Sequence, residues 1–274
     1  MTEEKTIEKA RPSKSELFDM IAENYLYERY GITLNELDEF YGLKVCKFMT
    51  RIREYDFGFV DAFGSQTVQA VTIEMNNQAI YNFDDLNFSP DDVVIDIGAN
   101  VGIVSTYLAR RFPFIKIYAY EPVKLNFDNL NRNLALNNVP QGIVTTERYA
   151  VNGTGEPVSI ASCIGNSGGA RALDCARDRF IQKGVDKDIP GITLQQIIEK
   201  HGIKKVKLLK IDCEGAEYDI LKNCPPETLS MIENIRGEFH GYFDKGGEKE
   251  IKKLVKHCKK YVPNVDIIET DFPD

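Results

Sequence analysis

The sequence lacks any apolar run of the roughly 18 residues that a membrane-spanning helix needs. Its N-terminal residues contain no apolar signal core, so we expect no export through a signal peptide and a cytoplasmic location. None of the six cysteines forms a Cys-x-x-Cys pair. That scatter argues against a zinc site and favours reduced thiols in a cytosolic protein.

Positive charge is also in short supply, because 34 Lys and Arg residues stand against 42 Asp and Glu residues. A net charge of −8 argues against general nucleic-acid binding, which depends on cationic side chains that release counterions. The length of 274 residues and the hydrophobic content of 43% are ordinary for a globular protein. They allow one large domain with a sizeable extension.

The first 88 residues differ in pattern from the rest of the chain. Their apolar spacing predicts two helices and then a β-hairpin of two short strands, over residues 15–25, 34–53, 67–74 and 79–83. We expect residues 1–88 to form a helical extension with a β-hairpin, which could mediate a homodimer. The border to the main domain, residues 89–274, is placed near Ser89 and Pro90.

The main domain alternates strand and helix patterns. Strands are predicted over residues 93–97, 115–120, 144–151, 206–211, 231–239 and 265–269. Helices are predicted over residues 102–111, 125–137, 193–202, 216–222 and 249–260. Alternation of this kind predicts an α/β fold with a doubly wound, Rossmann-like, mostly parallel sheet. Residues 153–190 fit neither pattern, and we interpret them as an irregular segment, either a functional lid or a surface loop.

The turn after the first strand of this domain carries the most information. Asp96 ends the strand, and Gly98 and Gly102 allow a sharp bend that opens a helix. A dinucleotide fingerprint counted from Gly98 would need glycine where Asn100 and Ile103 stand. A P-loop motif is absent as well. Asp96 is suited to an ammonium or to polar hydrogens rather than to a phosphate.

A second acid follows at the end of the next strand. Glu121 lies 25 positions after Asp96, close to the spacing at which an acid accepts hydrogen bonds from ribose hydroxyls. A nucleoside that carries an amino-acid tail and no phosphate satisfies both acids. S-adenosylmethionine is such a molecule.

Three runs resemble the FkbM-type S-adenosylmethionine-dependent methyltransferases: VVIDIGANVGIVSTYLA, YAYEP and VKLLKIDCEGAEYDIL. The resemblance covers residues 91–242, and the third run is the most specific signal. It implies a class I methyltransferase fold, S-adenosylmethionine as cofactor, and O-methylation of a hydroxyl on a small molecule or sugar. The N-terminal extension is not covered.

The resemblance also implies roles by position. It places Asp96, Gly98, Asn100 and Gly102 around the methionine part of the cofactor, Glu121 on the ribose, and Ala150 and Val151 at the adenine. The end of the fourth strand, Lys210 to Asp212, would then lie next to the methyl group.

Charged residues at that strand end agree with this placement. Lys210 and Asp212 share one side of the strand, and Glu214 and Glu217 open the following helix. Two interpretations stay open. The group could be helix capping with a lysine–carboxylate pair, or a site that orients and deprotonates a hydroxyl.

The fifth strand adds Glu238 and His240, which share a face and lie beside the fourth strand. His240 is a candidate general base, since imidazole titrates near neutral pH; it could equally be a structural histidine. Asp212, Glu238 and His240 could alternatively ligate a divalent metal ion, although their spacing is not diagnostic.

The sequence therefore predicts a methyltransferase with Lys210, Asp212, Glu238 and His240 as catalytic residues. Two rival functions remain. One is a non-catalytic module that binds S-adenosylmethionine, and the other is a nucleotide-dependent oxidoreductase, which the missing G-x-G-x-x-G disfavours.

Overall fold

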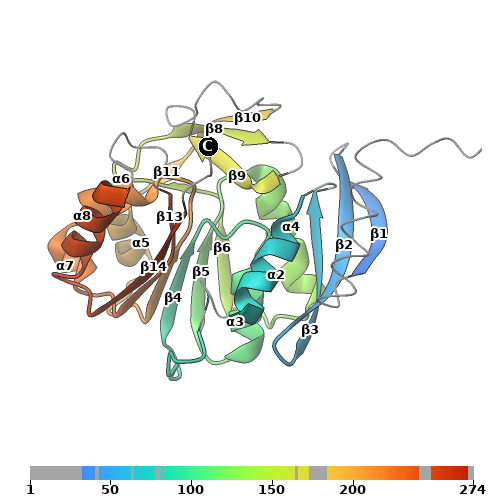
Figure 1. Cartoon of the computed structure of the whole chain (residues 1–274), viewed down its shortest axis with the longest axis horizontal. Coiled ribbons are helices and arrows are strands. Elements are labelled where there is room, and N and C mark those ends of the chain that lie inside the picture. The colour runs from blue at the N-terminus through green and yellow to red at the C-terminus, as the bar shows by residue number, and fades with distance from the viewer. Residues whose placement is uncertain are drawn as a thin grey trace, which may run out of the picture.

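A central sheet of six parallel strands organises the molecule (Figure 1). The computed structural model describes residues 33–40, 43–62, 65–77, 81, 83–163, 166–172, 184–240 and 248–270. The sheet has the order β14-β13-β12-β4-β5-β6. In chain order its strands are β4 (Val93–Ile97), β5 (Lys116–Tyr120), β6 (Val144–Glu147), β12 (Leu208–Ile211), β13 (Asn234–His240) and β14 (Asn264–Thr270). The predicted doubly wound α/β fold is confirmed.

Helices cover both faces of this sheet, which explains why its inner strands are almost continuously apolar. One face packs against α2 (Thr67–Asn77), α3 (Ile103–Arg111) and α4 (Lys124–Leu136). The other packs against α5 (Leu194–Lys200), α6 (Glu217–Asn223), α7 (Pro226–Leu229) and α8 (Glu248–Cys258). Within β4, Val94 contributes to the first of these cores and Ile95 to the second, as strand alternation requires.

The predicted third strand, residues 144–151, proves to be two strands. β6 stays in the central sheet, whereas β7 (Ala150–Val151) pairs in parallel with β11 (Gly191–Ile192) in a separate two-stranded sheet. The chain therefore leaves the central sheet before Ala150. Ala150 and Val151 do not continue β6, and they lie near the carboxyl end of β5.

The prediction of a helix over residues 34–53 is wrong. This stretch forms β1 (Thr33–Phe40) and β2 (Leu43–Ile52), which join β3 (Tyr55–Ala62) in an antiparallel sheet of order β1-β2-β3. In β2, burial alternates, with Phe48, Thr50 and Ile52 buried. Packing of one sheet face against the main domain therefore decides the structure over the helix-like apolar spacing. The helix predicted over residues 15–25 lies outside the described residues.

The hairpin predicted over residues 67–83 is wrong as well. Thr67–Asn77 is the helix α2, which buries Val68, Thr72 and Met75 at helical spacing. Its β-branched residues favour a strand by propensity, but contacts with the main domain override that preference. Tyr81 and Phe83 are buried outside regular structure.

Two asparagines, one in α4 and one at its C-cap, fasten the N-terminal sheet to the main domain. Asn133 and Asn137 lie one helical turn apart, and each exchanges two hydrogen bonds with the backbone of the edge strand β3. Asn133 bonds to the N–H and C=O of Val60 at 2.7 and 3.0 Å, and Asn137 to those of Gly58 at 3.0 and 2.7 Å. The side-chain amides thus complete the open edge of β3 as a neighbouring strand would. The division at residue 88 stays a prediction.

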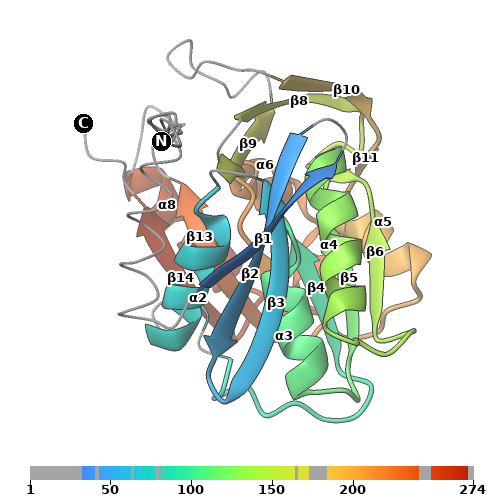
Figure 2. The same ribbon diagram turned by 90° about the vertical axis from the view of Figure 1, so that its right-hand side faces the viewer.

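A third, smaller sheet lies over the carboxyl ends of the central strands (Figure 2). It comprises β8 (Val158–Cys163), β9 (Asn166–Ala172) and β10 (Gly184–Ile189) in the order β10-β8-β9. The prediction of an irregular segment over residues 153–190 is therefore wrong for these strands, while residues 173–183 lie outside the described part. Among the residues described, no helix combines the length and the apolar character needed to cross a membrane.

Candidate functional site

Two cavities meet at the carboxyl edge of the central sheet. The first has a volume of about 700 Å³ and the second about 1410 Å³, each including its open mouth. Five residues line both cavities: Gly98, Asn100, Gly168, Asp212 and Glu214. Such a shared wall lets two molecules bound in separate cavities approach each other.

The loop between β4 and α3 forms part of that wall, and its backbone is unusual. Gly98, Asn100 and Gly102 all have positive φ, at 73°, 51° and 83°. At Gly98 a Cβ atom would lie 1.9 Å from the carbonyl oxygen of Asp212. Glycine is therefore required at this position by both the backbone conformation and the contact with the end of β12.

Every amide of this loop donates a hydrogen bond within the protein. The N–H groups of Gly98 and Ala99 reach the carbonyl of Tyr120, and that of Gly102 reaches Ala99. The N–H of Asn100 reaches Glu121 at 2.9 Å, and that of Val101 reaches the Asn100 side chain at 2.6 Å. Residues 98–102 thus present no free amide cradle of the kind that binds pyrophosphate.

Beneath the loop, Asp96 and Lys210 form a buried ion pair. The Lys210 Nζ lies 3.2 Å from Asp96 Oδ1 and donates a 2.7 Å hydrogen bond to the carbonyl of Gly98. The second oxygen of Asp96 accepts a 2.6 Å bond from Ser105. Burial lowers the pKa of Lys210, but the charges of Asp96 and Asp212 outweigh it and hold the pKa above its ordinary value. Asp96 lines neither cavity, so it supports the loop from below.

Glu121 lines the first cavity and is buried. One oxygen accepts the N–H of Asn100 and the other the N–H of Val123, each at 2.9 Å. Burial raises the pKa of Glu121 to about 7, against the lowering effect of these two N–H groups. Oε1 also accepts a longer bond of 3.5 Å from Asn126 Nδ2, so the ionised carboxylate keeps a lone pair on Oε2 for a further hydrogen bond.

The remaining walls of the first cavity are largely apolar. Ala150 and Val151 of β7 line it as the sequence predicts. Sequence reasoning missed Tyr149, Val158, Ile160 and Ala170, which also line it. The missed side chains come from the break between β6 and β7 and from the third sheet. A flat aromatic base suits such an apolar slot. Gly102, by contrast, lines neither cavity.

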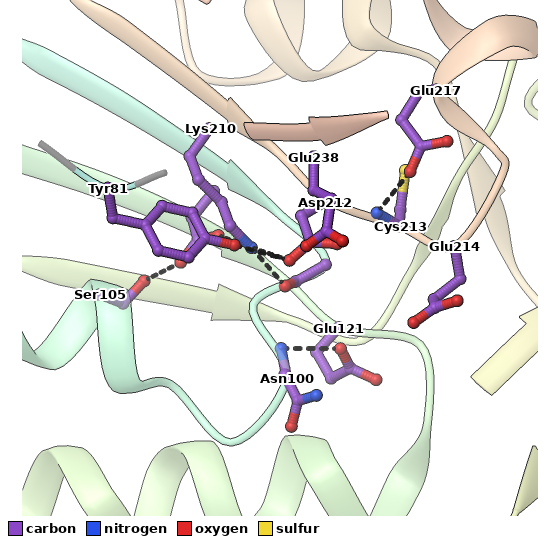
Figure 3. Close-up of polar contacts among 12 residues, drawn as sticks. Tyr81, Asn100, Ser105, Glu121, Lys210, Asp212, Cys213, Glu214, Glu217 and Glu238 are labelled. Carbon is purple, nitrogen blue, oxygen red and sulfur yellow. Dashed lines mark hydrogen bonds and ion pairs between the residues drawn. The ribbon is translucent and has the colours of Figure 1, made fainter. Parts of the chain in front are cut away.

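The second cavity brings together the four predicted catalytic residues, Lys210, Asp212, Glu238 and His240. Tyr81, which the sequence analysis did not single out, donates a 2.7 Å hydrogen bond to Asp212 Oδ2 (Figure 3). The other oxygen of Asp212 lies 3.9 Å from His240 Nε2. Asp212 is therefore held between a phenol and an imidazole at the point where the cavities join.

His240 is surrounded by carboxylates. Its Nδ1 lies 3.0 Å from Glu217 Oε1, and its Nε2 lies 3.8–3.9 Å from oxygens of Asp212, Glu214 and Glu238. Burial lowers its pKa, but the hydrogen bond to Glu217 and the surrounding charges outweigh it and raise the pKa to about 9. At neutral pH both ring nitrogens of His240 are therefore protonated, and the imidazolium cannot accept a further proton.

Glu217 bears on one of the two interpretations of the charged group at this strand end. Its oxygens accept the N–H groups of Cys213 and Gly215, each at 2.9 Å. Glu217 thus caps the turn into α6, as helix capping predicts. Asp212 and Glu214 line the cavity instead, and for them the interpretation as a site that orients and deprotonates a hydroxyl stays a prediction.

The set that could hold a metal ion is also brought together. Asp212, Glu238 and His240 each offer one ligand atom, and these atoms lie within 4.8 Å of one another. A protonated His240 offers no lone pair at Nε2, so a metal would have to displace its proton.

The N-terminal helix α2 supplies one wall of the second cavity, and this was missed entirely. Thr67, Ala70, Val71 and Glu74 line it. They follow the i, i+3, i+4, i+7 pattern of a single helical face. With helical periodicity, these four residues fall on one face. With the strand periodicity that the sequence analysis assigned, they fall on both faces, so the wall was not recognised.

Comparison with known proteins supports the family. The model of the methyltransferase FkbM domain matches residues 96–261. Methyltransferase 1 of Beauveria bassiana is 30% identical over 70% of this chain and 81% of its own length. Methyltransferase sdnD of Sordaria araneosa is 28% identical over 56% of this chain and 68% of its own. The 31-O-demethyl-FK506 methyltransferase FkbM of Streptomyces tacrolimicus is 25% identical over 55% and 66%.

Proposed function

The chain belongs to the FkbM family of S-adenosylmethionine-dependent methyltransferases, and from this premise we propose that it methylates a hydroxyl group on a small molecule or sugar. The observation that carries the proposal is the shared wall of the two cavities. One cavity offers a buried acid and an apolar slot, the other offers Asp212, and they meet at Gly98 and Asp212. The name of the relative from Streptomyces tacrolimicus, which refers to an O-demethyl acceptor, supports oxygen as the methylated atom.

The residues of the first cavity fit S-adenosylmethionine. Glu121 can accept hydrogen bonds from ribose hydroxyls, and Ala150 and Val151 can contact adenine. Gly98 and Asn100 would lie along the methionine part. The absence of a free amide cradle over residues 98–102 suits a ligand without phosphate. When bound, the cofactor supplies a methyl group that its sulfonium has already made electrophilic.

The protein's own contribution is position and proton acceptance. Asp212 lines both cavities and accepts the proton of the acceptor hydroxyl as the oxygen attacks. Tyr81 holds one carboxylate oxygen of Asp212, which leaves the other for that proton. His240 is already protonated, so it stabilises the carboxylates of Asp212 and Glu238 instead of serving as the base. Lys210 fixes the loop through the carbonyl of Gly98.

Calorimetry and methyl transfer test the proposal together. We expect S-adenosylhomocysteine to bind the wild-type protein and NADH not to bind. Tritium from methyl-labelled S-adenosylmethionine should appear in a hydroxylated acceptor from a panel of sugars and polyketide alcohols. Asp212→Asn should keep the cofactor affinity and lower transfer at least about 100-fold, the range for loss of an acid–base group.

The matched control is Asp266→Asn, which changes an exposed aspartate on β14 and should leave transfer unchanged. Binding of NADH with no binding of S-adenosylhomocysteine would refute the cofactor assignment. Tight cofactor binding with no transfer to any alcohol, amine or thiol would favour a non-catalytic module.

A further inference from the structure

The charge of the second cavity indicates which acceptors it selects. Its lining includes four carboxyl side chains, Glu74, Asp212, Glu214 and Glu238, and two cationic ones, Lys210 and His240. The shortest contacts of the cations are with groups outside this set of four: Lys210 with Asp96 and the Gly98 carbonyl, and His240 with Glu217. Their contacts with the four carboxyl side chains are longer, at 3.8–3.9 Å. The lining is thus more acidic than basic.

Glu74 is the member of this set that comes from outside the matched family region, which begins at residue 96. It lies on the cavity-lining face of α2, half-buried, opposite the ends of β12 and β13. Burial raises the pKa of Glu74 to about 8, and the charges of Glu238 and Asp212 add to this effect. The carboxyl groups of α2 and of the two strand ends therefore interact electrostatically across the cavity.

A cavity with this lining discriminates by charge. A carboxylate or phosphate on the acceptor would meet four acidic groups in a partly desolvated space, whereas an ammonium would relieve their mutual repulsion. Hydroxyl groups fit beside either, because carboxylates accept hydrogen bonds from them.

We propose, resting on the methyltransferase function above, that Glu74 is an acceptor-selecting residue and that the second cavity takes a polyhydroxylated acceptor carrying a basic nitrogen, to the exclusion of acidic acceptors. The catalytic chemistry stays with the end of β12, and the choice of acceptor falls to α2. A divalent metal held by Asp212, Glu238 and His240 is the competing use of the same carboxylates, and the test separates the two.

Three matched probes test the charge preference: glucamine, sorbitol and gluconate, which differ only at the first carbon. Saturation-transfer NMR at about pH 8.5, where Glu74 with its pKa of about 8 is mostly ionised, measures the affinity of each probe with the protein saturated in S-adenosylhomocysteine. We expect glucamine to bind at least about tenfold more tightly than gluconate, with sorbitol between them. Glu74→Gln should weaken glucamine about fivefold and leave sorbitol unchanged. Glu156→Gln, which removes an exposed carboxylate that lines neither cavity, should change neither.

Equal affinities for glucamine and gluconate, no detectable binding of any probe, or an unchanged glucamine affinity in Glu74→Gln would each overturn the proposal. A fourth arm titrates Mn²⁺ alone by calorimetry; stoichiometric binding that Asp212→Asn abolishes would assign the carboxylates to a metal and overturn it as well. The methyltransferase function fails separately, through loss of S-adenosylhomocysteine binding. If that binding fails, the affinities for glucamine, sorbitol and gluconate are measured on the protein without S-adenosylhomocysteine, so the charge preference is tested independently.

Discussion

Two regions of this molecule bury polar side chains, and they do so in opposite ways. Between α4 and β3, the neutral amides of Asn133 and Asn137 are matched one to one with backbone groups at 2.7–3.0 Å. At the ends of β12 and β13, charged groups face one another at 3.8–3.9 Å. The first arrangement satisfies every bond within the protein. The second leaves room and charge for another molecule, which is what a functional site requires.

We call the groups at the ends of β12 and β13 the charged region, and the Asn133 and Asn137 contacts the neutral region. The largest loss of stability should come from removing the buried cation of the charged region, Lys210. Lys210→Met leaves Asp96 buried without its ion pair, and removing one partner of such a pair costs about 3–5 kcal/mol. Urea unfolding measures this loss. The control Lys222→Met removes an exposed lysine that lies 3.9 Å from Glu250 and should change stability by less than about 0.5 kcal/mol. Equal urea midpoints of unfolding for the two variants would show that Lys210 does not stabilise the folded protein.

The neutral region should respond somewhat less. Asn133→Ala deprives the N–H and C=O of Val60 and the C=O of Val101 of their partner in a buried interface. Buried groups left unsatisfied cost about 2–3 kcal/mol here, again measured by urea unfolding. Asn131→Ala, on the exposed side of the same helix, should cost less than about 0.5 kcal/mol. An undiminished midpoint for Asn133→Ala would mean that the N-terminal sheet does not depend on α4.

The two regions also differ in how far the sequence predicted them. The charged region was predicted because its residues follow strands buried on both faces, and such strands show as short continuous apolar runs: β4 and β12. Parallel strands bring their carboxyl ends to one edge. Asp212, Glu238 and His240 could therefore be grouped from spacing alone.

The neutral region was not predictable in the same way. Residues 34–53 carry apolar side chains at spacings that suit a helix, and only packing against the main domain selects the alternation seen at Phe48, Thr50 and Ile52. Residues 67–77 carry β-branched side chains yet form α2. Because residues 67–83 read as a hairpin in the sequence, Glu74 of α2 and Tyr81 beyond it were missing from the predicted site. Local propensity could not reveal a helix that long-range contacts stabilise.

The pH dependence of stability sharpens the comparison, since the side-chain amides of Asn133 and Asn137 do not titrate. The pKa of His240 is raised to about 9 in the folded protein, so its stabilising effect is complete below the ordinary histidine pKa of about 6.5 and is lost as the pH rises through 9. We expect wild type to lose about 2 kcal/mol between pH 7 and pH 9 through this group.

Thermal unfolding of wild type and His240→Gln over this pH range measures the effect. Glu74 and Glu121 also have raised pKa values, of about 8 and 7, and shift stability in the same direction, so the difference between the two proteins isolates His240. Parallel pH profiles for the two proteins would contradict the raised pKa. Asn133→Ala serves as the control from the neutral region, and its profile should run parallel to that of wild type.

The smallest effect concerns Glu121. Like the charged groups it is ionisable, and like Asn133 and Asn137 it is hydrogen-bonded to the backbone, here to two amides at 2.9 Å. Its pKa of about 7 means that it gains its full charge only above neutral pH. The ionised form alone can accept hydrogen bonds from ribose hydroxyls while it keeps both amide bonds. The affinity for S-adenosylhomocysteine should therefore rise up to about tenfold from pH 6 to pH 8. Calorimetry should show that Glu121→Gln removes this rise, and a rise that persists in the variant would assign it to another group.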